Sequence, residues 1–251
     1  MSAPTERFTD RVEDYARYRP GYPAQLLDWL AEACSLAPSW TVADIGSGTG
    51  LLTRLFLDYG CAVYGVEPNA AMRAAGEAYL AGYARFGSIA GRAEATTLPD
   101  RSVDLVTAGQ AFHWFEPQHS RAEFARILRP GGWVALVWNT RRLDTPFLQD
   151  YETLLQTRCP EYRAIAASHA DEDVIAAFFG PDGYRAHTLN YRQVFDLEGL
   201  RGRTLSASYV PAPNRPGHAA LMAELEALFL RHQRDGRVSF DYDTRVFLGR
   251  L

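Results

Sequence analysis

Short apolar runs alternate with amphipathic segments over the first 140 residues of the chain. The apolar runs have the length and composition typical of strands inside a parallel sheet. They end near Ile45, Glu67, Ala90, Gly109 and Trp138. The segments between them repeat apolar residues at the i, i+3 and i+4 spacing of helices. These helices are expected at 23–36, 51–59, 70–79 and 118–128. The order predicts βαβ units with right-handed crossovers and a parallel sheet.

The pattern changes after residue 140. Two helical segments, 146–158 and 171–179, follow one another without a strand between them, which suggests a helical lid inserted after the fifth strand. Apolar and polar residues alternate over 189–195 and again over 238–242, as in half-buried strands. The segment 244–251 is expected to supply the last strand.

The most informative segment is 41–50, TVADIGSGTG, where an apolar run ends in Asp44 and glycines follow at alternate positions. A strand, a glycine-rich turn and a helix in succession build a nucleotide pocket at the carboxyl end of the first strand. Glycine suits this turn because a Cβ would block a ligand and because the turn can need a positive φ. Gly50 comes one residue too early for a dinucleotide fingerprint, and no lysine follows as a phosphate-binding P-loop requires.

A second acid ends the next predicted strand. Glu67 follows the glycines by about 20 residues, the spacing at which a carboxylate meets ribose hydroxyls. Asp44 and Glu67 are therefore expected at the tips of adjacent strands, facing one crevice. The extra anion disfavours a pyrophosphate and favours a ligand with a ribose and an ammonium or sulfonium centre. Here the chain resembles the class I S-adenosylmethionine (SAM)-dependent methyltransferases, in which DIGSGTG is the first motif and the acid ending strand two holds the ribose.

The resemblance extends over most of the chain. Residues 91–106 are similar to the family's loop after strand three and the start of its strand four, and residues 127–138 match its LRPGG turn before strand five. The family implies a doubly wound, Rossmann-like, seven-stranded α/β sheet, mostly parallel with the last strand antiparallel, plus an N-terminal helical segment. We expect a single domain. Its limits are 1–251, with a core at about 23–140 and 185–251 and lid elements at 1–22 and 141–184.

The resemblance also implies SAM as the cofactor and S-adenosylhomocysteine as the product. In the family, the loop after strand three contacts the adenine, a role that falls here on the backbone of Ala93 and on Glu94. The expected cofactor-binding residues are Arg19, Asp44, Gly46, Ser47, Gly48, Glu67, Pro68, Met72, Ala93, Glu94 and Gln110.

The N-terminal segment 15–23, YARYRPGYP, resembles an element that precedes the core in trans-aconitate methyltransferase-like enzymes. Pro20 favours an extended conformation at Arg19. The Arg19 guanidinium would pair with the carboxylate of SAM or with an acidic substrate; alternatively, it is a surface arginine in a Pro-Gly turn. Tyr15 is a candidate for the substrate pocket, because an N-terminal lid would bring it over the cofactor.

The segment 110–115, QAFHWF, follows strand four at the edge where ligands bind. His113 is the candidate catalytic residue, because an imidazole accepts a proton from a hydroxyl acceptor near neutral pH. The rival interpretation is an aromatic wall that excludes water, since a carboxylate acceptor needs no base. Phe112 and Trp114, together with Trp138, are the predicted walls of the substrate pocket.

Composition narrows the function further. The net charge is −4 and no basic stripe is evident, which argues against a nucleic-acid partner. All side-chain cations other than histidine are arginines, so lysine Schiff-base chemistry is impossible. The cysteines, Cys34, Cys61 and Cys159, have neither disulfide nor metal-ligand spacing, and no metal is expected. The sequence has no apolar stretch long enough to span a membrane and no signal-like N-terminus, so we expect a cytoplasmic protein that does not bind membranes. We expect it to be a monomer or a homodimer.

The sequence thus predicts methyl transfer to a small molecule, with a carboxylate or hydroxyl oxygen favoured, by in-line displacement at the sulfonium methyl. One alternative is a SAM-binding protein that has lost catalysis and acts as a regulator or interaction partner. A nicotinamide-dependent oxidoreductase on the same topology is a weaker alternative, because the glycine register differs and a Tyr-x-x-x-Lys pair is impossible without lysine.

Overall fold

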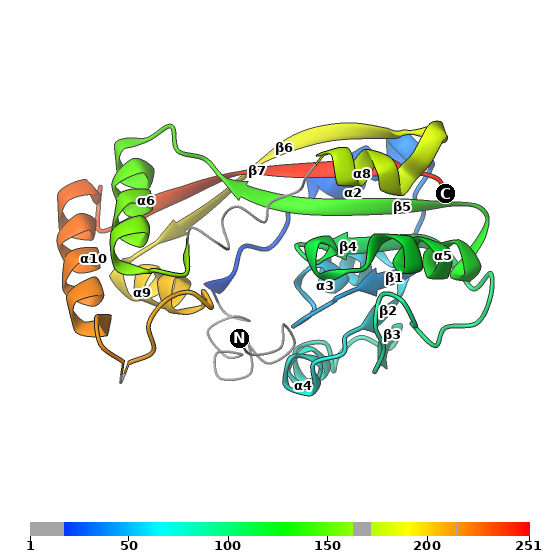
Figure 1. The fold of residues 1–251 in the computed structure, drawn as a ribbon, viewed down its shortest axis with the longest axis horizontal. Helices are drawn as coiled ribbons and strands as arrows, with labels where there is room; N and C mark the ends of the chain where they lie inside the picture. Colours follow the sequence, from blue (N-terminus) through cyan, green and yellow to red (C-terminus); the bar gives the residue numbers. More distant parts are fainter. Residues whose placement is uncertain (1–17, 163–171, 214) are drawn as a thin grey trace.

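The computed structural model describes residues 18–162, 172–213 and 215–251. The strands in these ranges form one seven-stranded sheet in the order β3-β2-β1-β4-β5-β7-β6 (Figure 1). They are β1 (Thr41–Ile45), β2 (Ala62–Val66), β3 (Phe86–Ile89), β4 (Val103–Gly109), β5 (Leu128–Arg141), β6 (Tyr184–Phe195) and β7 (Val238–Gly249). β7 is antiparallel to both β5 and β6, and the other neighbouring pairs are parallel. The predicted Rossmann-like sheet is confirmed.

The helices of the first half begin and end close to their predicted positions. They are α2 (Gln25–Cys34), α3 (Leu51–Tyr59), α4 (Ala70–Tyr79) and α5 (Pro117–Ile127), with the 3-10 helix η3 (Phe112–Trp114) before α5. The Asn69 side chain caps α4 by accepting hydrogen bonds from the backbone N–H groups of Ala71 and Met72. The predicted N-terminal helical segment falls largely on residues 1–17, outside the described ranges.

Apolar clusters fill both faces of the sheet. Phe56 of α3 and Leu30 of α2 belong to the cluster on one face. On the other face, Phe124 of α5 and Phe178 of α8 (Glu172–Phe179) pack edge to face, with ring centroids 6.0 Å apart. The helix α8 was expected in a lid, but it covers the sheet beside α5 because its apolar side needs burial. The short 3-10 helix η4 (Gly180–Asp182) leads from α8 to β6.

The remaining helices lie at the far end of the long strands β6 and β7 (Figure 1). We call them the outer helices: α6 (Pro146–Arg158), α9 (Leu197–Leu205) and α10 (His218–His232). β5 ends at Arg141 opposite Tyr242, whereas β6 and β7 stay paired as far as Phe195 opposite Val238. This extension of the hairpin carries Phe240 into an apolar cluster shared with all three outer helices.

Two features of the second half differ from expectation. The segments 238–242 and 244–251 do not form separate strands, because Asp243 pairs with residues of both β5 and β6 and leaves the ladder unbroken. The helices α9 and α10 were not predicted. For α10 a signal existed, since its buried residues recur at helical spacing; they are Leu221, Leu225, Leu228 and Phe229.

Candidate functional site

The glycines of the turn between β1 and α3 serve different purposes. A Cβ on Gly46 would lie 2.6 Å from the Cβ of Ala111, and one on Gly50 would lie 2.7 Å from a leucine methyl, so both permit close packing. Gly48 has a φ of +57°, a conformation that L side chains rarely adopt. Among described atoms, a Cβ there would meet the Cε of Met72 alone, at 3.4 Å. Gly48 therefore keeps the turn open toward solvent and a ligand.

Glu67 ties the end of β2 to this turn. Its carboxylate accepts hydrogen bonds from the backbone N–H of Asn69 (Oε1, 2.8 Å) and of Gly48 (Oε2, 2.9 Å). The residue is 8% exposed, and burial raises the pKa of its carboxyl, while the two hydrogen bonds oppose the rise. Each oxygen retains a lone pair for a further donor, such as a ribose hydroxyl.

Asp44, at the end of β1, is fully buried. Its Oδ2 accepts a 2.6 Å hydrogen bond from Thr53 Oγ1, whereas its Oδ1 has no hydrogen-bond partner within the described ranges. Burial raises the pKa of Asp44 to about 7, and the charge of Glu67 adds to the rise. Because a buried carboxylate oxygen without a donor is costly, a cationic ligand that donates to it would bind favourably.

A cavity of about 390 Å³ opens at the carboxyl ends of β1, β4 and β5. The predicted site residues that line it are Arg19, Asp44, Gly46, Ser47, Gly48, Gln110, His113, Trp114 and Trp138. The opposite wall consists of residues from the outer helices and the segments joined to them. This outer wall includes Arg141, Glu152, Tyr162, Arg203, Ser208, Tyr209 and Tyr242. One cavity therefore joins the glycine-rich turn to the outer helices.

Some predicted site residues lie away from the cavity lining. They are Glu67, Pro68, Met72, Ala93, Glu94 and Phe112. Glu94 accepts a 2.9 Å hydrogen bond from the backbone N–H of Glu116 and lies 3.4 Å from the Arg92 guanidinium. These contacts hold the loop after β3 to the start of α5. Tyr15 falls outside the described residues.

Phe112 was predicted to line the substrate pocket, but it lies outside the lining of this cavity. Its ring is buried in the core, where it packs edge to face on Trp138, with centroids 6.1 Å apart, and on Phe178, at 4.8 Å. A 3-10 helix turns successive side chains by about 120°, so the turn that buries Phe112 leaves His113 and Trp114 exposed. The rings of His113 and Trp114 lie 4.9 Å apart at the cavity.

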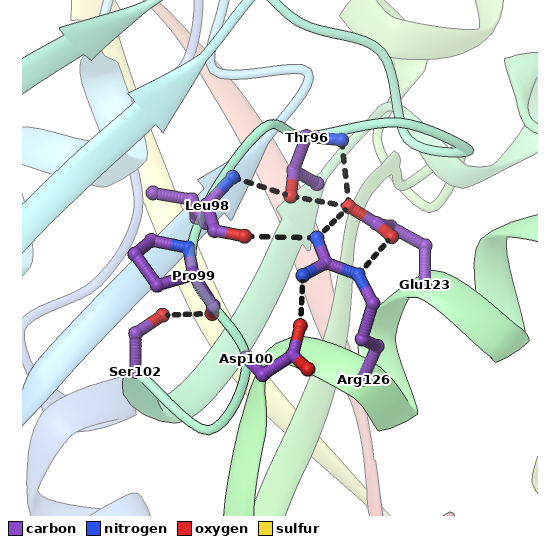
Figure 2. Close-up of polar contacts among 7 residues, drawn as sticks. All are labelled: Thr96, Leu98, Pro99, Asp100, Ser102, Glu123 and Arg126. Carbon is purple, nitrogen blue, oxygen red and sulfur yellow. Dashed lines mark hydrogen bonds and ion pairs between the residues drawn. The ribbon is translucent and has the colours of Figure 1, made fainter.

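A polar network fixes the loop that follows Ala93 against α5 (Figure 2). Glu123 accepts hydrogen bonds from the backbone N–H and the hydroxyl of Thr96, at 2.8 and 2.5 Å. Arg126 binds Glu123, the carbonyl of Leu98 and the carboxylate of Asp100. Arg126 first, and Thr96 in addition, lower the pKa of Glu123 to about 2. The charged network therefore persists at neutral pH and holds this loop in place.

Gln110 and Asn139, after β4 and within the end of β5, connect the cavity to the N-terminal segment. Gln110 Nε2 donates a 3.0 Å hydrogen bond to the carbonyl of Asn139. The Asn139 side chain donates in turn to the carbonyl of Gly21, at 2.8 Å. Arg19 Nη2 donates to the carbonyl of Ser206, at 3.2 Å. The segment that carries Arg19 is therefore fixed between the sheet and the end of α9.

The residues of the outer wall were missed by sequence reasoning. Arg141 had a usable signal, because it ends strand five at the same sheet edge as Asp44. Arg203 had none, since it lies on α9, a helix with two glycines that was not predicted. The extended β6–β7 hairpin brings α9 to the cavity, and such long-range placement leaves no local pattern.

Comparison with known proteins identifies the family. Residues 43–136 match the model of a methyltransferase domain. An uncharacterised methyltransferase of Mycobacterium tuberculosis is 40% identical over 134 residues, which are 53% of this chain and 52% of that protein. An uncharacterised methyltransferase-like protein of Schizosaccharomyces pombe is 32% identical over 248 residues, 96% of this chain and 93% of that one. The chain belongs to the class I SAM-dependent methyltransferases.

Solved structures share the methyltransferase fold. A proposed type II methyltransferase from Anaeromyxobacter dehalogenans has a TM-score of 0.67 at 24% identity, covering 93% of this chain and 98% of its own. The match spans about half of the length, 52%, of each mycobacterial relative. No helix in the described ranges has the length and apolarity needed to cross a membrane. Within the same ranges, His, Cys, Asp and Glu side chains nowhere gather in a group that could hold a metal ion.

The geometry fits the cofactor that this methyltransferase family uses. The Asp44 oxygen without a donor suits the ammonium or sulfonium of SAM. Glu67, whose oxygens keep free lone pairs, suits the ribose hydroxyls, and the open backbone at Gly48 permits close approach. Arg19 lines the same cavity and suits the SAM carboxylate.

We expect the affinity for S-adenosylhomocysteine to rise about tenfold between about pH 6 and about pH 8. With its pKa raised to about 7, Asp44 is mostly protonated at the lower pH, and a bound ammonium favours its ionised form. The stability that Asp44 contributes to the unliganded fold, in contrast, decreases as the pH rises. It is complete below the ordinary pKa of 3.8 and is lost as the pH rises through about 7. Calorimetry in buffers of different ionisation enthalpy measures the affinity and the released proton.

Asp44→Asn is the matched control, because it keeps the side-chain size and removes the titration. Its affinity should be lower and nearly independent of pH, apart from a contribution of Glu67, whose pKa burial also raises. A wild-type affinity that stays flat over this pH range would show that Asp44 does not face the cationic part of the ligand.

Proposed function

We propose that the chain transfers the methyl group of SAM to an oxygen of a small-molecule acceptor, a carboxylate or a hydroxyl. The observation that carries the proposal is the single cavity that joins Asp44 and the glycine-rich turn to the outer wall. Bound SAM supplies an electrophilic methyl group; the acceptor oxygen bonds to it with a lone pair, and the C–S bonding electrons return to sulfur.

In this proposal, the residues around β1 and β2 hold the cofactor. Asp44 attracts its positive charge, Glu67 accepts from the ribose and Arg19 pairs with its carboxylate. The backbone of Ala93 lies in the loop that the Glu123–Arg126 network fixes to α5, which would give the adenine a rigid partner. Rigid positioning lowers the barrier because the reacting atoms are held in line before the reaction.

In this proposal, the acceptor binds in the part of the cavity between Trp138, Trp114 and the outer wall, which has aromatic and polar sides. Trp138 is buried, whereas Trp114 is 43% exposed at the rim, and Tyr162 and Tyr209 stand on the outer wall with ring centroids 4.9 Å apart. Aromatic walls limit the access of water, which favours a transfer in which opposite charges neutralise one another. An oxygen acceptor is consistent with this environment and with the arginines of the outer wall.

For His113→Asn we expect kcat to fall by less than about tenfold, with an unchanged shape of the pH–rate profile. The physical reason is that an exposed imidazole beside Trp114 shields the cavity, and a carboxylate acceptor has no proton to lose. Steady-state kinetics from acidic to basic pH on the identified acceptor measure both quantities.

The surface variant His119→Asn, on α5, serves as the control. A loss in kcat of about 10²- to 10⁴-fold for His113→Asn, together with disappearance of the acidic limb near neutral pH, would instead identify His113 as a general base.

The proposed function is tested in two steps. Calorimetry first measures S-adenosylhomocysteine and NAD binding to the full chain, and the proposal requires the former and not the latter. An acceptor screen over small carboxylic acids and phenols then follows S-adenosylhomocysteine release, with mass spectrometry of the methylated product. Cofactor binding without turnover across such a library would favour a silent SAM-binding protein over an enzyme.

A further inference from the structure

The outer wall of the cavity carries more positive than negative charge. Arg141, at the end of β5, and Arg203, on α9, both line it, and Glu152 is the carboxylate beside them. Arg141 and Arg203 are close enough to repel one another electrostatically. An arginine stays protonated even when it is buried. Two guanidinium groups against one carboxylate therefore leave this wall with an excess positive charge.

Arg203 is buried with an unused hydrogen-bond donor. The residue is 5% exposed; its Nε donates a 3.1 Å hydrogen bond to the Tyr242 hydroxyl, and its guanidinium lies 5.9 Å from the centroid of the Phe240 ring. Its Nη1 is buried and has no hydrogen-bond partner in the part of the chain that the structure describes. A charged donor left in this state is costly, so an anion that accepts from it would bind favourably.

Arg141 is held in place and also retains a donor. Its Nη2 binds Glu152 and the Tyr162 hydroxyl, the latter at 3.0 Å, and its guanidinium lies 4.8 Å from the centroid of the Tyr151 ring. These contacts fix the orientation of the group. Its Nε is buried without a hydrogen-bond partner among the described residues. The outer wall thus contains two fixed arginines, each with a buried nitrogen that has no hydrogen-bond partner among the described residues.

We propose that Arg141 and Arg203 bind a carboxylate of the methyl acceptor, an inference that rests on the proposed function. The two nitrogens without partners suit the two oxygens of one carboxylate, and the single charge of a carboxylate equals the excess positive charge of this wall. A phosphate monoester carries nearly two negative charges and would exceed it. The bound anion also relieves the repulsion between the two arginines.

The carboxylate that the arginines bind is not the group that is methylated. Donors on both of its oxygens engage the lone pairs that a nucleophile needs, and the nearby positive charge weakens them further. The acceptor therefore has a second oxygen group, and the new C–O bond forms there while the C–S bond breaks toward sulfur. If the second group is a hydroxyl, its proton leaves to water. The arginine-bound carboxylate keeps its charge throughout.

The SAM carboxylate is the other carboxylate that could occupy this site, and the experiment separates the two sources. Calorimetry measures S-adenosylhomocysteine binding to wild type and to Arg203→Gln. It then measures the binding of benzoate, benzamide and phenyl phosphate, each with and without S-adenosylhomocysteine. These three compounds share a phenyl ring and differ in the head group. Arg201→Gln is the matched control, because this arginine lies on the same helix and pairs with Glu226 at the surface.

We expect wild type to bind benzoate at least about tenfold more tightly than benzamide or phenyl phosphate. Arg203→Gln should lose this preference and keep its affinity for S-adenosylhomocysteine, while Arg201→Gln should match wild type. If the glutamine variant does not fold, Arg203→Lys takes its place, because lysine keeps the positive charge. Arg203→Lys should weaken benzoate binding, because an ammonium lacks the planar fork of a guanidinium.

Three results would overturn the inference. The first is a wild-type protein that binds benzoate no better than benzamide, and the second is tighter, Arg203-dependent binding of phenyl phosphate. The third is a loss of S-adenosylhomocysteine affinity in Arg203→Gln equal to the loss for benzoate, which would assign the arginines to the cofactor. Failure of S-adenosylhomocysteine to bind wild type would overturn the proposed function instead, and the benzoate measurements made without it still decide the anion site.

Discussion

Replacing Gly48 by valine is expected to weaken SAM binding by at least about 100-fold, with little change in the far-UV spectrum. Gly48 has a φ of +57° and lines the cavity, so a β-branched side chain both strains the turn and fills the space next to the ligand. Its backbone N–H also donates to Glu67, so a shift of the turn would displace this proposed partner of the ribose. Calorimetry with S-adenosylhomocysteine measures the loss.

The contribution of backbone strain alone is measured at another glycine. Gly131 has a φ of +79°, nothing described lies within 4 Å of a Cβ placed there, and it stands outside the cavity lining. Gly131→Val should lower the melting temperature and leave S-adenosylhomocysteine binding intact. If Gly48→Val binds the ligand as tightly as Gly131→Val does, the turn does not approach the cofactor.

Glu67→Ala is expected to weaken S-adenosylhomocysteine binding by about 3 kcal/mol, or roughly 100-fold, in a folded protein. The loss combines two charge-assisted hydrogen bonds from the ribose with the loosening of the turn, since the backbone N–H groups of Asn69 and Gly48 lose their acceptor. Glu67→Gln keeps the side-chain shape and one acceptor oxygen, so its loss should be smaller. Titration calorimetry compares the two variants with wild type.

A thermodynamic cycle that combines one mutation with one change of the ligand separates the contact of Glu67 with the ribose from its contact with the turn. Wild type should bind the 2′-deoxy analogue of S-adenosylhomocysteine more weakly than the parent compound, whereas Glu67→Ala should bind both alike. Equal discrimination by wild type and Glu67→Ala would leave Glu67 with a structural role in the turn and no contact with the ribose.

The part of the site that could be predicted from the sequence is the part formed by neighbouring residues. Asp44, Gly48 and Glu67 lie at or just after the ends of predicted strands, so the carboxyl edge of a parallel sheet brings them together. The helices α3, α4 and α6 were placed at their observed bounds because apolar periodicity and proline or glycine boundaries are local signals.

The outer wall could not be predicted in this way. Arg203 approaches Arg141 because the hairpin of β6 and β7 extends past β5, and the length of that extension depends on pairing between distant residues. The burial of Phe112 beside the exposed His113 depends on a single 3-10 turn, which leaves no periodic pattern. The same turn determines that the His113 ring, and not the Phe112 ring, lines the cavity.

The placement of the two halves of the cavity bears on how such proteins diverge under selection. The match to the family model ends at residue 136, so it includes Asp44 and Glu67 but stops before Arg141 and Arg203. Under the proposed function, mutations in the outer helices that keep the contact between Arg19 and Ser206 can therefore accumulate without changing the residues that hold SAM. A lineage can acquire a new acceptor by changing the end of one hairpin and the helices attached to it, while inheriting its methyl-donor site unaltered.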